Sequence, residues 1–444
     1  MGLVHLRCCS GTREMRVKNR GQDKNPKEVL MKILTLTLEY PPQIFGGLGT
    51  YVTGLSQEIS RTGDASDIFL YRSDVYLDAE FDPNPMSGIR VEAVRLPAYS
   101  GLYWVDQIAA NTAILDALMR RLRSPYPPVY DVVHCHSWIL YQAGKTFADH
   151  LGIPIVGHYH RLEIPQNPPT TAAPGFAEPN VARLQYALSM DRYMGQSADA
   201  IIAVGQELLR KLQHLEANLA PSHAIPCALG DKDLPTLAPD EYWEQRQDSL
   251  RRAQRPLRLL FAGRLVSVKG LDIALAARQR LGDCPIELAV AGDGPESSVL
   301  DSYRDCPWLT ILGHLDRKEI DQAYAWADFV VVPSLQEPFG YVVIEALARG
   351  IPVLGSDTGG IQEILSPDER LGLLLPPGDI SAWTSAFQTV LRTAPQWLTP
   401  ERAQLRRTHV EINYAWPKVY QQIREVYLQV LEGHNHEINA EQQN

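Results

Sequence analysis

The chain alternates short, almost wholly apolar runs with longer segments of helical spacing. From Met31 the order is a β-type run "KILTLTLEY", a glycine-bearing loop "PPQIFGGLG" and a helical pattern "TYVTGLSQEISRTG". Further apolar strands are predicted at 131–136, 153–160 and 199–205, with helical stretches between them. Short apolar strands separated by helices are typical of a parallel sheet covered by helices on both faces.

The same pattern restarts in the second half. A strand running into a glycine-bearing loop is predicted at 257–270, and more strands at 286–294, 309–315, 327–334 and 351–357. The Pro-, Gly- and Asp-rich stretch "HAIPCALGDKDLPTLAPDEYW" lies between the halves and is typical of a linker. The predicted fold class is therefore α/β, with two Rossmann-like doubly wound domains. Ligands bind outside the carboxyl ends of such strands, so both domains can face one central cleft.

Domain limits follow from these patterns. We predict an N-terminal Rossmann-like domain over 31–225 and a C-terminal Rossmann-like domain over 226–410, followed by a helix over 411–433. The apolar stripe of "WPKVYQQIREVYLQVLEG" supports that helix, and the polar tail 434–444 is expected to fray.

Composition and charge narrow the classes of protein. A chain of 444 residues that is 45% apolar and 21% charged suits two globular domains. The formal net charge of −10 argues against a general nucleic-acid binder, and no apolar run is long enough for a transmembrane helix. Six scattered cysteines without C-x-x-C spacing favour a reduced, cytoplasmic setting, with peripheral membrane association as an alternative.

Residues 1–30 differ from the rest of the chain. They hold seven Lys or Arg against three acidic residues, and their apolar stretches are too short for a signal peptide. We expect a disordered tail or a start codon assigned too early; acylation of Cys8 and Cys9 is the alternative.

The stretch "PSLQEPFGYVVIEALARG" carries the first candidate chemistry. A strand ends near Ser334, a turn follows, and a helix is predicted to begin near Gly340. The free N–H groups of a helix start bind anions, and a glycine lets phosphate approach the backbone. Glu337 and Glu345 would flank that phosphate, and carboxylates accept hydrogen bonds from sugar hydroxyls. The pattern fits a nucleotide-sugar; the alternative is a dipole-pairing glutamate followed by a solvated one.

Two further loops bear on the ligand. In "GRLVSVKG", Arg264 follows a strand and Lys269 opens the next helix, a spacing that suits a diphosphate, although surface cations are common. In "EYPPQIFGGLGTY" the glycines do not form G-x-G-x-x-G, and Pro41-Pro42 separates them from the strand. We interpret that segment as a long flap whose glycines allow backbone contact with a ligand.

Two H-x-H pairs end adjacent predicted strands: His134 with His136, and His158 with His160. No nearby acidic or cysteine residue completes a convincing ligand set, so we predict no metal site, and one histidine as a polar contact to substrate. The D-x-D pattern at 231–233 lies in the linker and is interpreted as chance.

The chain resembles glycosyltransferase family 4 of the GT-B fold, and its N-terminal loop is similar to that of bacterial glycogen-synthase-like members. The motifs that carry the resemblance follow in the family's order from Met31 to about Leu431: "EYPPQIFGGLGTYV", "GRLVSVKGLD", "AVAGDGPE", "PSLQEPFGYVVIEALARG", "IPVLGSDTGGIQEIL" and "GLLLPPGD". One departure is "CALGDKD", where the family often has Asn-Gly-Val-Asp.

The resemblance implies a role for each matched residue. Arg264 and Lys269 would hold the donor diphosphate, Glu337 the hexose hydroxyls and Glu345 the ribose. The remaining implied contacts are His160 near the reacting end of the sugar, Gly47 closing on the diphosphate or acceptor, and the phosphate loop of Phe339, Gly340 and Tyr341. The catalytic set would be His160, Arg264, Lys269 and Glu337. The N-terminal domain would bind the acceptor and the C-terminal domain the nucleotide-sugar donor. The final helix would cross back onto the N-terminal domain.

The function implied is a retaining hexosyltransferase that uses a nucleoside diphosphate sugar as co-substrate, with no cofactor and no metal. UDP is the expected base, with ADP or GDP as alternatives. The acceptor, a carbohydrate, small molecule or lipid-linked sugar, is set by loops that include the Pro-rich segment 167–180. Two other classes stay open: a nucleotide-sugar 2-epimerase of the same fold and a non-catalytic nucleotide-sugar binder.

Overall fold

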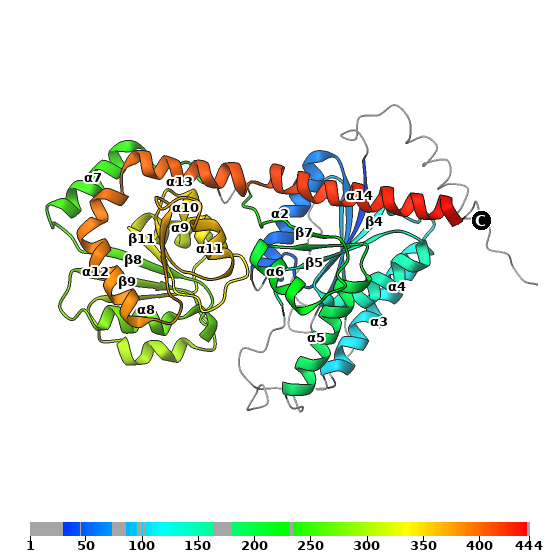
Figure 1. Ribbon diagram of the computed structural model, residues 1–444, viewed down its shortest axis with the longest axis horizontal. Helices are drawn as coiled ribbons and strands as arrows, with labels where there is room; N and C mark the ends of the chain where they lie inside the picture. Colours follow the sequence, from blue (N-terminus) through cyan, green and yellow to red (C-terminus); the bar gives the residue numbers. More distant parts are fainter. Residues whose placement is uncertain are drawn as a thin grey trace, which may run out of the picture.

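The computed structural model describes residues 30–44, 46–72, 86–95, 100, 103–162, 180–230 and 234–441. The expectations for the N-terminal tail, for the D-x-D pattern and for most of the Pro-rich segment before Asn180 fall outside these residues. Within them, two parallel sheets lie in separate halves of the molecule, each covered by helices (Figure 1).

The first half contains a seven-stranded sheet in the order β3-β2-β1-β4-β5-β6-β7, with every neighbouring pair parallel. Its strands β4, β5 and β6 are buried along their whole length, and apart from the paired histidines of β4 and β5 they consist of apolar residues and glycine. The strands are β1 (Lys32–Thr37), β2 (Ala65–Arg72), β3 (Ile89–Arg95), β4 (Val132–His136), β5 (Ile155–Tyr159), β6 (Ala200–Ala203) and β7 (Ser222–Ala224).

The second half contains a six-stranded parallel sheet in the order β10-β9-β8-β11-β12-β13. In both sheets the strand order reverses direction beside the first strand, which is the switch point where this architecture places its ligands. The strands are β8 (Leu257–Ala262), β9 (Ile286–Ala291), β10 (Leu309–Gly313), β11 (Phe329–Val332), β12 (Val353–Ser356) and β13 (Gly372–Leu375).

Helices connect the strands and cover the sheets. In the first half they are α2 (Gly47–Thr62), α3 (Tyr103–Leu122), α4 (Tyr141–Leu151), α5 (Asn180–Ser197) and α6 (Gln206–Leu215), with the short helix η3 (Trp138–Leu140). In the second half they are α7 (Asp240–Arg251), α8 (Leu271–Gln279), α9 (Arg317–Trp326), α10 (Tyr341–Ala348), α11 (Gly359–Leu365), α12 (Ile380–Trp397) and α13 (Pro400–Asn413), with η5 (Ser267–Lys269) and η6 (Ser297–Tyr303).

The last helix, α14 (Trp416–Glu441), joins the two halves. It continues from α13, which covers the second half, and runs along the first half against α2 (Figure 1). A Cβ atom at Gly54 of α2 would lie 2.1 Å from Nε1 of Trp416, so the helices pack closely because residue 54 is glycine. Tyr420 of α14 also donates a hydrogen bond to the buried Asp64.

Two helices and four strands differ from the sequence prediction. The helix after β1 begins at Gly47, so Gly47 and Gly49 belong to its first turn and not to a flap. The helix α14 does not end at Gly433 but continues to Glu441. A glycine inside a helix costs only about 1 kcal/mol, and His434 bonds the carbonyl of Gly152 at 2.9 Å, so tertiary contact holds the next turn. Strands β2, β3, β7 and β13 were not predicted.

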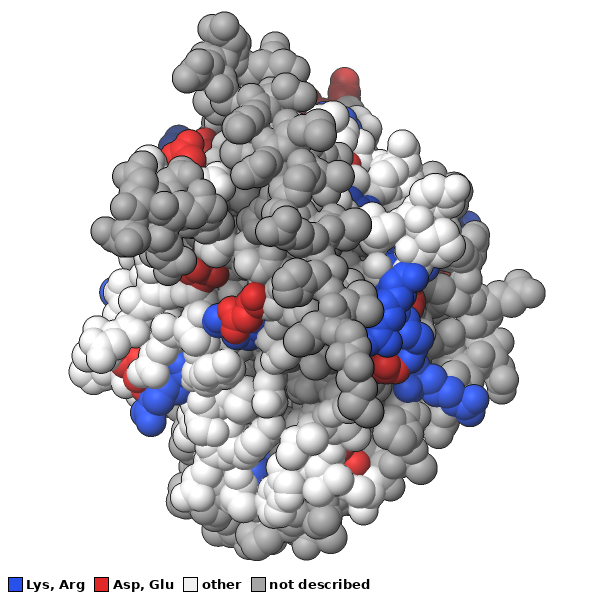
Figure 2. Space-filling model, turned by 90° about the vertical axis from the view of Figure 1, so that its right-hand side faces the viewer, with Lys and Arg blue, Asp and Glu red and all other residues white. Residues whose placement is uncertain are grey.

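The surface bears charges of both signs. On the end of the first half seen in Figure 2, blue and red side chains stand close together, and much of the described surface between them is white. No helix among the described residues is long and apolar enough to cross a membrane.

Candidate active site

A cleft of about 660 Å³ lies between the two halves, at the carboxyl ends of β4, β5, β8 and β11. All nine residues proposed from the sequence line it: Gly47, His160, Arg264, Lys269, Glu337, Phe339, Gly340, Tyr341 and Glu345. They come from both sheets and span nearly 300 positions of the chain. The fold therefore brings the whole predicted set to one place, although their roles stay predictions.

The helix α10 points its N-terminus into this cleft. Gly340 precedes it with φ 107°, a backbone conformation that residues with a Cβ rarely adopt. The first N–H groups of any helix have no partner within the helix, and here they lie where both halves meet. This helix start can therefore bind an anion, as the sequence suggested.

Two loops of the second half are hydrogen-bonded to each other. One, 264–270, carries Arg264 and Lys269, and the other, 333–340, carries Glu337. The backbone N–H of Leu335 donates to the carbonyl of Val268 at 2.8 Å. A Cβ at Gly270 would lie 2.1 Å from the carbonyl oxygen of Pro333, so that glycine permits the close approach. Residues 264–270 and 333–340 consequently form one rigid wall of the cleft.

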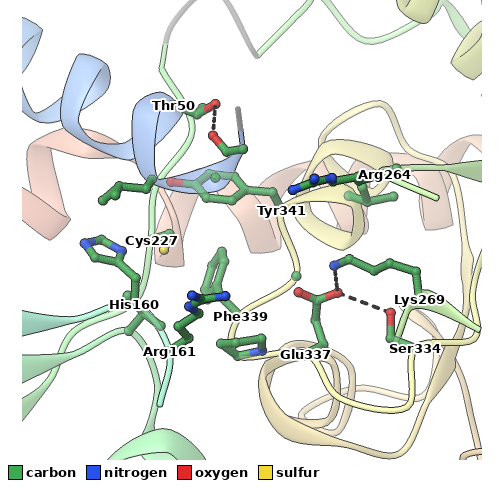
Figure 3. Close-up of a pocket in the computed structure, with 18 of the residues that line it drawn as sticks. Thr50, His160, Arg161, Cys227, Arg264, Lys269, Ser334, Glu337, Phe339 and Tyr341 are labelled. Atoms are coloured by element: carbon green, nitrogen blue, oxygen red, sulfur yellow. Dashed lines mark hydrogen bonds and ion pairs between the residues drawn. The ribbon is translucent and has the colours of Figure 1, made fainter. Parts of the chain in front are cut away.

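Lys269 and Glu337 face each other on that wall. Lys269 Nζ lies 2.5 Å from Glu337 Oε2, and Ser334 Oγ donates to the same oxygen at 3.2 Å (Figure 3). The Glu337 side chain is only 11% exposed and that of Lys269 is 30% exposed, so the pair is only partly screened by water. The pair holds a cation and a hydrogen-bond acceptor at the mouth of the anion site.

A glycine pair supports the turn that carries Glu337. The N–H of Gly360 donates to the carbonyl of Glu337 at 2.9 Å. A Cβ at Gly359 would lie 2.0 Å from that carbonyl, and one at Gly360 would lie 2.0 Å from the carbonyl of Phe339. The start of α11 can therefore pack against this turn only because both residues are glycines, which explains "TGG" in the sequence.

A buried tyrosine holds the carboxylate of Glu345 in place. Tyr324 of α9 donates its hydroxyl to Glu345 Oε2 at 2.7 Å. Burial, reinforced by this carboxylate, raises the pKa of Tyr324 well above its usual value, so the tyrosine stays a donor. The carboxylate of Glu345 is thus fixed about one turn into α10, whereas Glu337 precedes the helix in the chain.

Tyr341 occupies the interface between the halves. A Cβ at Gly47 would lie 3.1 Å from two ring carbons of Tyr341, and the Tyr341 ring meets that of Phe339 at 5.5 Å between centroids. The side chain is therefore committed to packing across the domain boundary. Any contribution of Tyr341 to phosphate binding has to come from its backbone N–H.

His160 faces the cleft from the first half (Figure 3). Its Nε2 pairs with Nδ1 of His136 at 3.0 Å. Burial lowers the pKa of His160 to about 3, so the ring is neutral at physiological pH. The neutral imidazole of His160, with one nitrogen already paired, can make a polar contact to a ligand but does not supply a positive charge.

The other histidines lie behind His160 in the core. His134 Nε2 pairs with Nδ1 of His158 at 3.1 Å, and the hydroxyl of Tyr427 in α14 pairs with Nδ1 of His134 at 2.6 Å. Ring nitrogens of His134, His136 and His158 approach within 4.8 Å of one another, a spacing open to metal ligation. His134 pairs with His158 and His136 pairs with His160, and among the described residues Nε2 of His136 and Nε2 of His158 have no hydrogen-bond partner. Burial lowers the pKa values of all three rings. The absence of a metal stays a prediction.

The lining residues that were not singled out from the sequence include Thr50, Arg161 and Cys227. Arg161 projects into the cleft between His160 and the loop of Glu337 (Figure 3). Its position directly after a histidine at a strand end was an available signal. Cys227 is buried, which raises the pKa of its thiol, and no pattern in the sequence marked it.

Each half of the chain matches the model of a known protein family. Residues 45–229 match the model described as Glycosyltransferase Family 4, and residues 256–393 match Glycosyl transferases group 1. The glycogen synthase of Mycobacterium tuberculosis is 27% identical over 421 residues, covering 91% of this chain and 96% of the relative. The D-inositol 3-phosphate glycosyltransferase of Xylanimonas cellulosilytica is 28% identical over 386 residues, covering 83% and 89%.

Solved structures share the fold. A sucrose-phosphate synthase from Thermosynechococcus elongatus superposes with a TM-score of 0.70 at 21% identity, covering 91% of this chain and all of that one. Anabaena HepE in complex with UDP-glucose gives a TM-score of 0.65 at 19% identity, covering 90% of this chain and all of that one. The two-domain α/β architecture predicted from the sequence is confirmed.

Proposed function

The chain belongs to glycosyltransferase family 4, and we propose that it transfers a hexose, with retention of anomeric configuration, from a UDP-sugar to a hydroxyl group of a carbohydrate or small-molecule acceptor. Glycosyl transfer from a nucleoside diphosphate sugar is the activity of this class. The nucleotide, the stereochemistry and the residue roles are the parts proposed.

One observation carries the proposal: two carboxylates flank a helix start that also faces two cations. Glu337 precedes the start of α10 in the chain, Glu345 lies within the helix, and both line one cleft with Lys269 and Arg264. A diphosphate at the helix start would be neutralised by the cations, with a sugar ring extending toward each carboxylate. When the donor binds, Lys269 would pair with the phosphate instead of with Glu337. The Glu337 carboxylate would then be available to the hexose hydroxyls.

In the proposed chemistry the protein positions the reactants and stabilises the charge that develops on the leaving group. The bond between the anomeric carbon and the diphosphate oxygen breaks, and its electron pair stays on the leaving nucleoside diphosphate. The acceptor hydroxyl forms the new bond on the same face and gives its proton to the departing phosphate oxygen. Arg264, Lys269 and the N–H groups of α10 would stabilise the growing negative charge, and neutral His160 would contact the sugar near the reacting carbon.

The test is turnover with a panel of nucleotide-sugars and acceptors. We expect release of UDP from a UDP-hexose, and a product whose anomeric proton coupling in NMR matches that of the donor. The Glu337→Ala variant should lose at least about 100-fold in kcat/KM, the loss of one or two charge-assisted hydrogen bonds, while unfolding at the wild-type temperature. Wild-type rates in that variant would contradict the site assignment.

The same assay separates the alternatives. An epimerase would convert the hexose of the labelled nucleotide-sugar without any acceptor, and a non-catalytic binder would release no nucleotide. Inversion of the anomeric centre in the product would contradict the proposed mechanism while leaving the transferase class intact.

A further inference from the structure

Three neighbouring rings hold His160 at the edge of the cleft. Its imidazole is stacked on that of His158, with 4.4 Å between the centroids and 9° between the planes. The ring of Tyr51 meets it edge-on with 4.9 Å between centroids, and Nδ1 of His136 pairs with its Nε2 at 3.0 Å. The ring of His160 is therefore placed before any ligand binds, which is what a contact to a reacting sugar requires.

Of these three contacts, only the bond to His136 distinguishes the two nitrogens of His160. A half-turn of the His160 imidazole about its Cβ–Cγ bond would keep the stack on His158 and the contact with Tyr51. It would, however, place a carbon atom opposite Nδ1 of His136 and leave that buried nitrogen without its partner. Because an unpaired buried polar atom is costly, His136 selects one of the two orientations of the ring.

The second nitrogen of His136 determines where the proton of that ring lies. The side chain is 1% exposed, and among the described residues its Nε2 has no hydrogen-bond partner. Burial lowers the pKa of His136 well below its usual value, so the ring is neutral and carries a single proton. A buried N–H without an acceptor is rarer in proteins than a buried acceptor without a donor. The proton therefore lies on Nδ1, which donates to Nε2 of His160.

The proton of His160 is placed by this bond. A neutral imidazole whose Nε2 accepts a hydrogen bond carries its own proton on Nδ1. His160 is neutral because burial lowers its pKa to about 3. Among the described residues His160 forms no hydrogen bond other than that to His136, so its Nδ1–H is available to a ligand in the cleft that His160 lines.

We propose that His136 is a positioning residue for the transfer: it fixes the ring orientation and the tautomer of His160, which then presents Nδ1–H as a hydrogen-bond donor to an oxygen of the donor hexose. The inference rests on the proposed function, which places His160 beside that sugar, and adds the direction of the contact. His160 donates and the sugar oxygen accepts. His136 does not itself line the cleft and acts only through His160.

Strand β4 provides a matched control. His134 lies two residues before His136 on the same face of the strand and is equally buried. It pairs with His158 and with the hydroxyl of Tyr427, and not with His160. Replacing either histidine removes a buried, hydrogen-bonded ring, but only the change at position 136 releases His160.

NMR of the wild-type protein with nitrogen-15 in its histidine rings tests the tautomer directly. Couplings between ring protons and ring nitrogens show which nitrogen is protonated, and the signals lost in His160→Asn and in His136→Asn identify the two residues. At pH 7.5 we expect a protonated Nδ1 and an unprotonated Nε2 in both rings. A proton on Nε2 of His160 would overturn the proposal.

Calorimetry tests what His136 contributes to donor binding. The probes are UDP, UDP-glucose, UDP-galactose and UDP-N-acetylglucosamine, and the ratio of the Kd of the tightest UDP-hexose to that of UDP reports on the hexose. His136→Leu should raise this ratio about 2- to 10-fold, the loss of one neutral hydrogen bond, and leave the Kd of UDP unchanged. His136→Asn, whose amide N–H can replace Nδ1–H, should restore most of the loss. His134→Leu should leave the ratio at the wild-type value.

Three binding results would overturn the role of His136: an unchanged ratio in His136→Leu, an equal rise in His134→Leu, or no recovery in His136→Asn. If His136→Leu does not fold, the NMR result and the ratio in His136→Asn, expected near that of the wild type, still decide. Failure of UDP and of all three UDP-hexoses to bind would instead contradict the proposed function, and the NMR result would still decide the tautomer.

Discussion

The pair formed by Lys269 and Glu337 allows the roles of both residues to be separated. In one interpretation Lys269 binds the donor diphosphate and only rests against Glu337 when no ligand is present. In the other, Lys269 serves to orient Glu337 and never contacts phosphate. The distance of 2.5 Å between Nζ and Oε2 is compatible with both.

A double-mutant cycle distinguishes them through the binding of UDP, which lacks the hexose. A lysine bonded to phosphate contributes about 1.5–3 kcal/mol, which corresponds to a roughly 10- to 150-fold change in Kd. We therefore expect Lys269→Ala to weaken UDP by about that factor, and by a similar factor in the Glu337→Gln background. Glu337→Gln alone should leave UDP binding near the wild-type value and weaken the UDP-hexose.

Calorimetry on the four proteins of the cycle provides the measurement, with Lys318→Ala, an exposed lysine of α9, as the control. If Lys269→Ala leaves the Kd of UDP unchanged, or if its effect vanishes once Glu337 is replaced, then Lys269 is a partner of Glu337 and not a phosphate ligand. The proposed neutralisation of the diphosphate would then be refuted.

Three other outcomes follow from the structure. Asp328→Asn should lower the free energy of unfolding by about 3–5 kcal/mol in urea titrations, because it leaves the buried Arg246 and the partly buried Arg255 without their shared carboxylate. Asp248→Asn, on an exposed pair, should cost less than about 1 kcal/mol, and equal losses would contradict this. Burial lowers the pKa of His134 from 6.5 to about 3, so its contribution to stability is complete above pH 6.5 and is lost as pH falls toward 3. In urea titrations the wild-type protein should lose about 1.4 kcal/mol more stability between pH 7.5 and pH 5.5 than the His134→Gln variant loses; the same loss in both proteins would exclude a contribution from His134. Gly360→Ala should abolish donor binding in calorimetry while the protein stays folded, because its Cβ would meet the carbonyl of Phe339 at 2.0 Å; unchanged donor binding would show that this turn can shift without harm.

The parts of the site that were predictable come from contiguous motifs. The turn and helix from Pro333 to Gly350 carry their own start signal at Gly340, so Glu337 and Glu345 could be placed on either side of it from spacing alone. Apolar strands between helices likewise predicted both sheets. Local sequence determines local geometry in these cases.

Contacts between distant segments could not be predicted. Glu363 meets the N–H of Gln206 across 157 positions, and Tyr324 meets Glu345 only because α9 packs beside α10. The start of α2 was misplaced for the same reason: Gly47 packs against Tyr341 of the other half, a contact that spacing within the loop does not reveal.

The central claim is that a diphosphate binds at the start of α10 between two sugar-binding carboxylates. A crystal structure of the protein with a bound UDP-hexose tests it most directly. We expect the diphosphate within hydrogen-bond distance of the N–H groups that follow Gly340, with Glu345 bonded to the ribose and Glu337 to the hexose. A nucleotide bound elsewhere, or one whose two sugar rings contact neither carboxylate, would contradict the account.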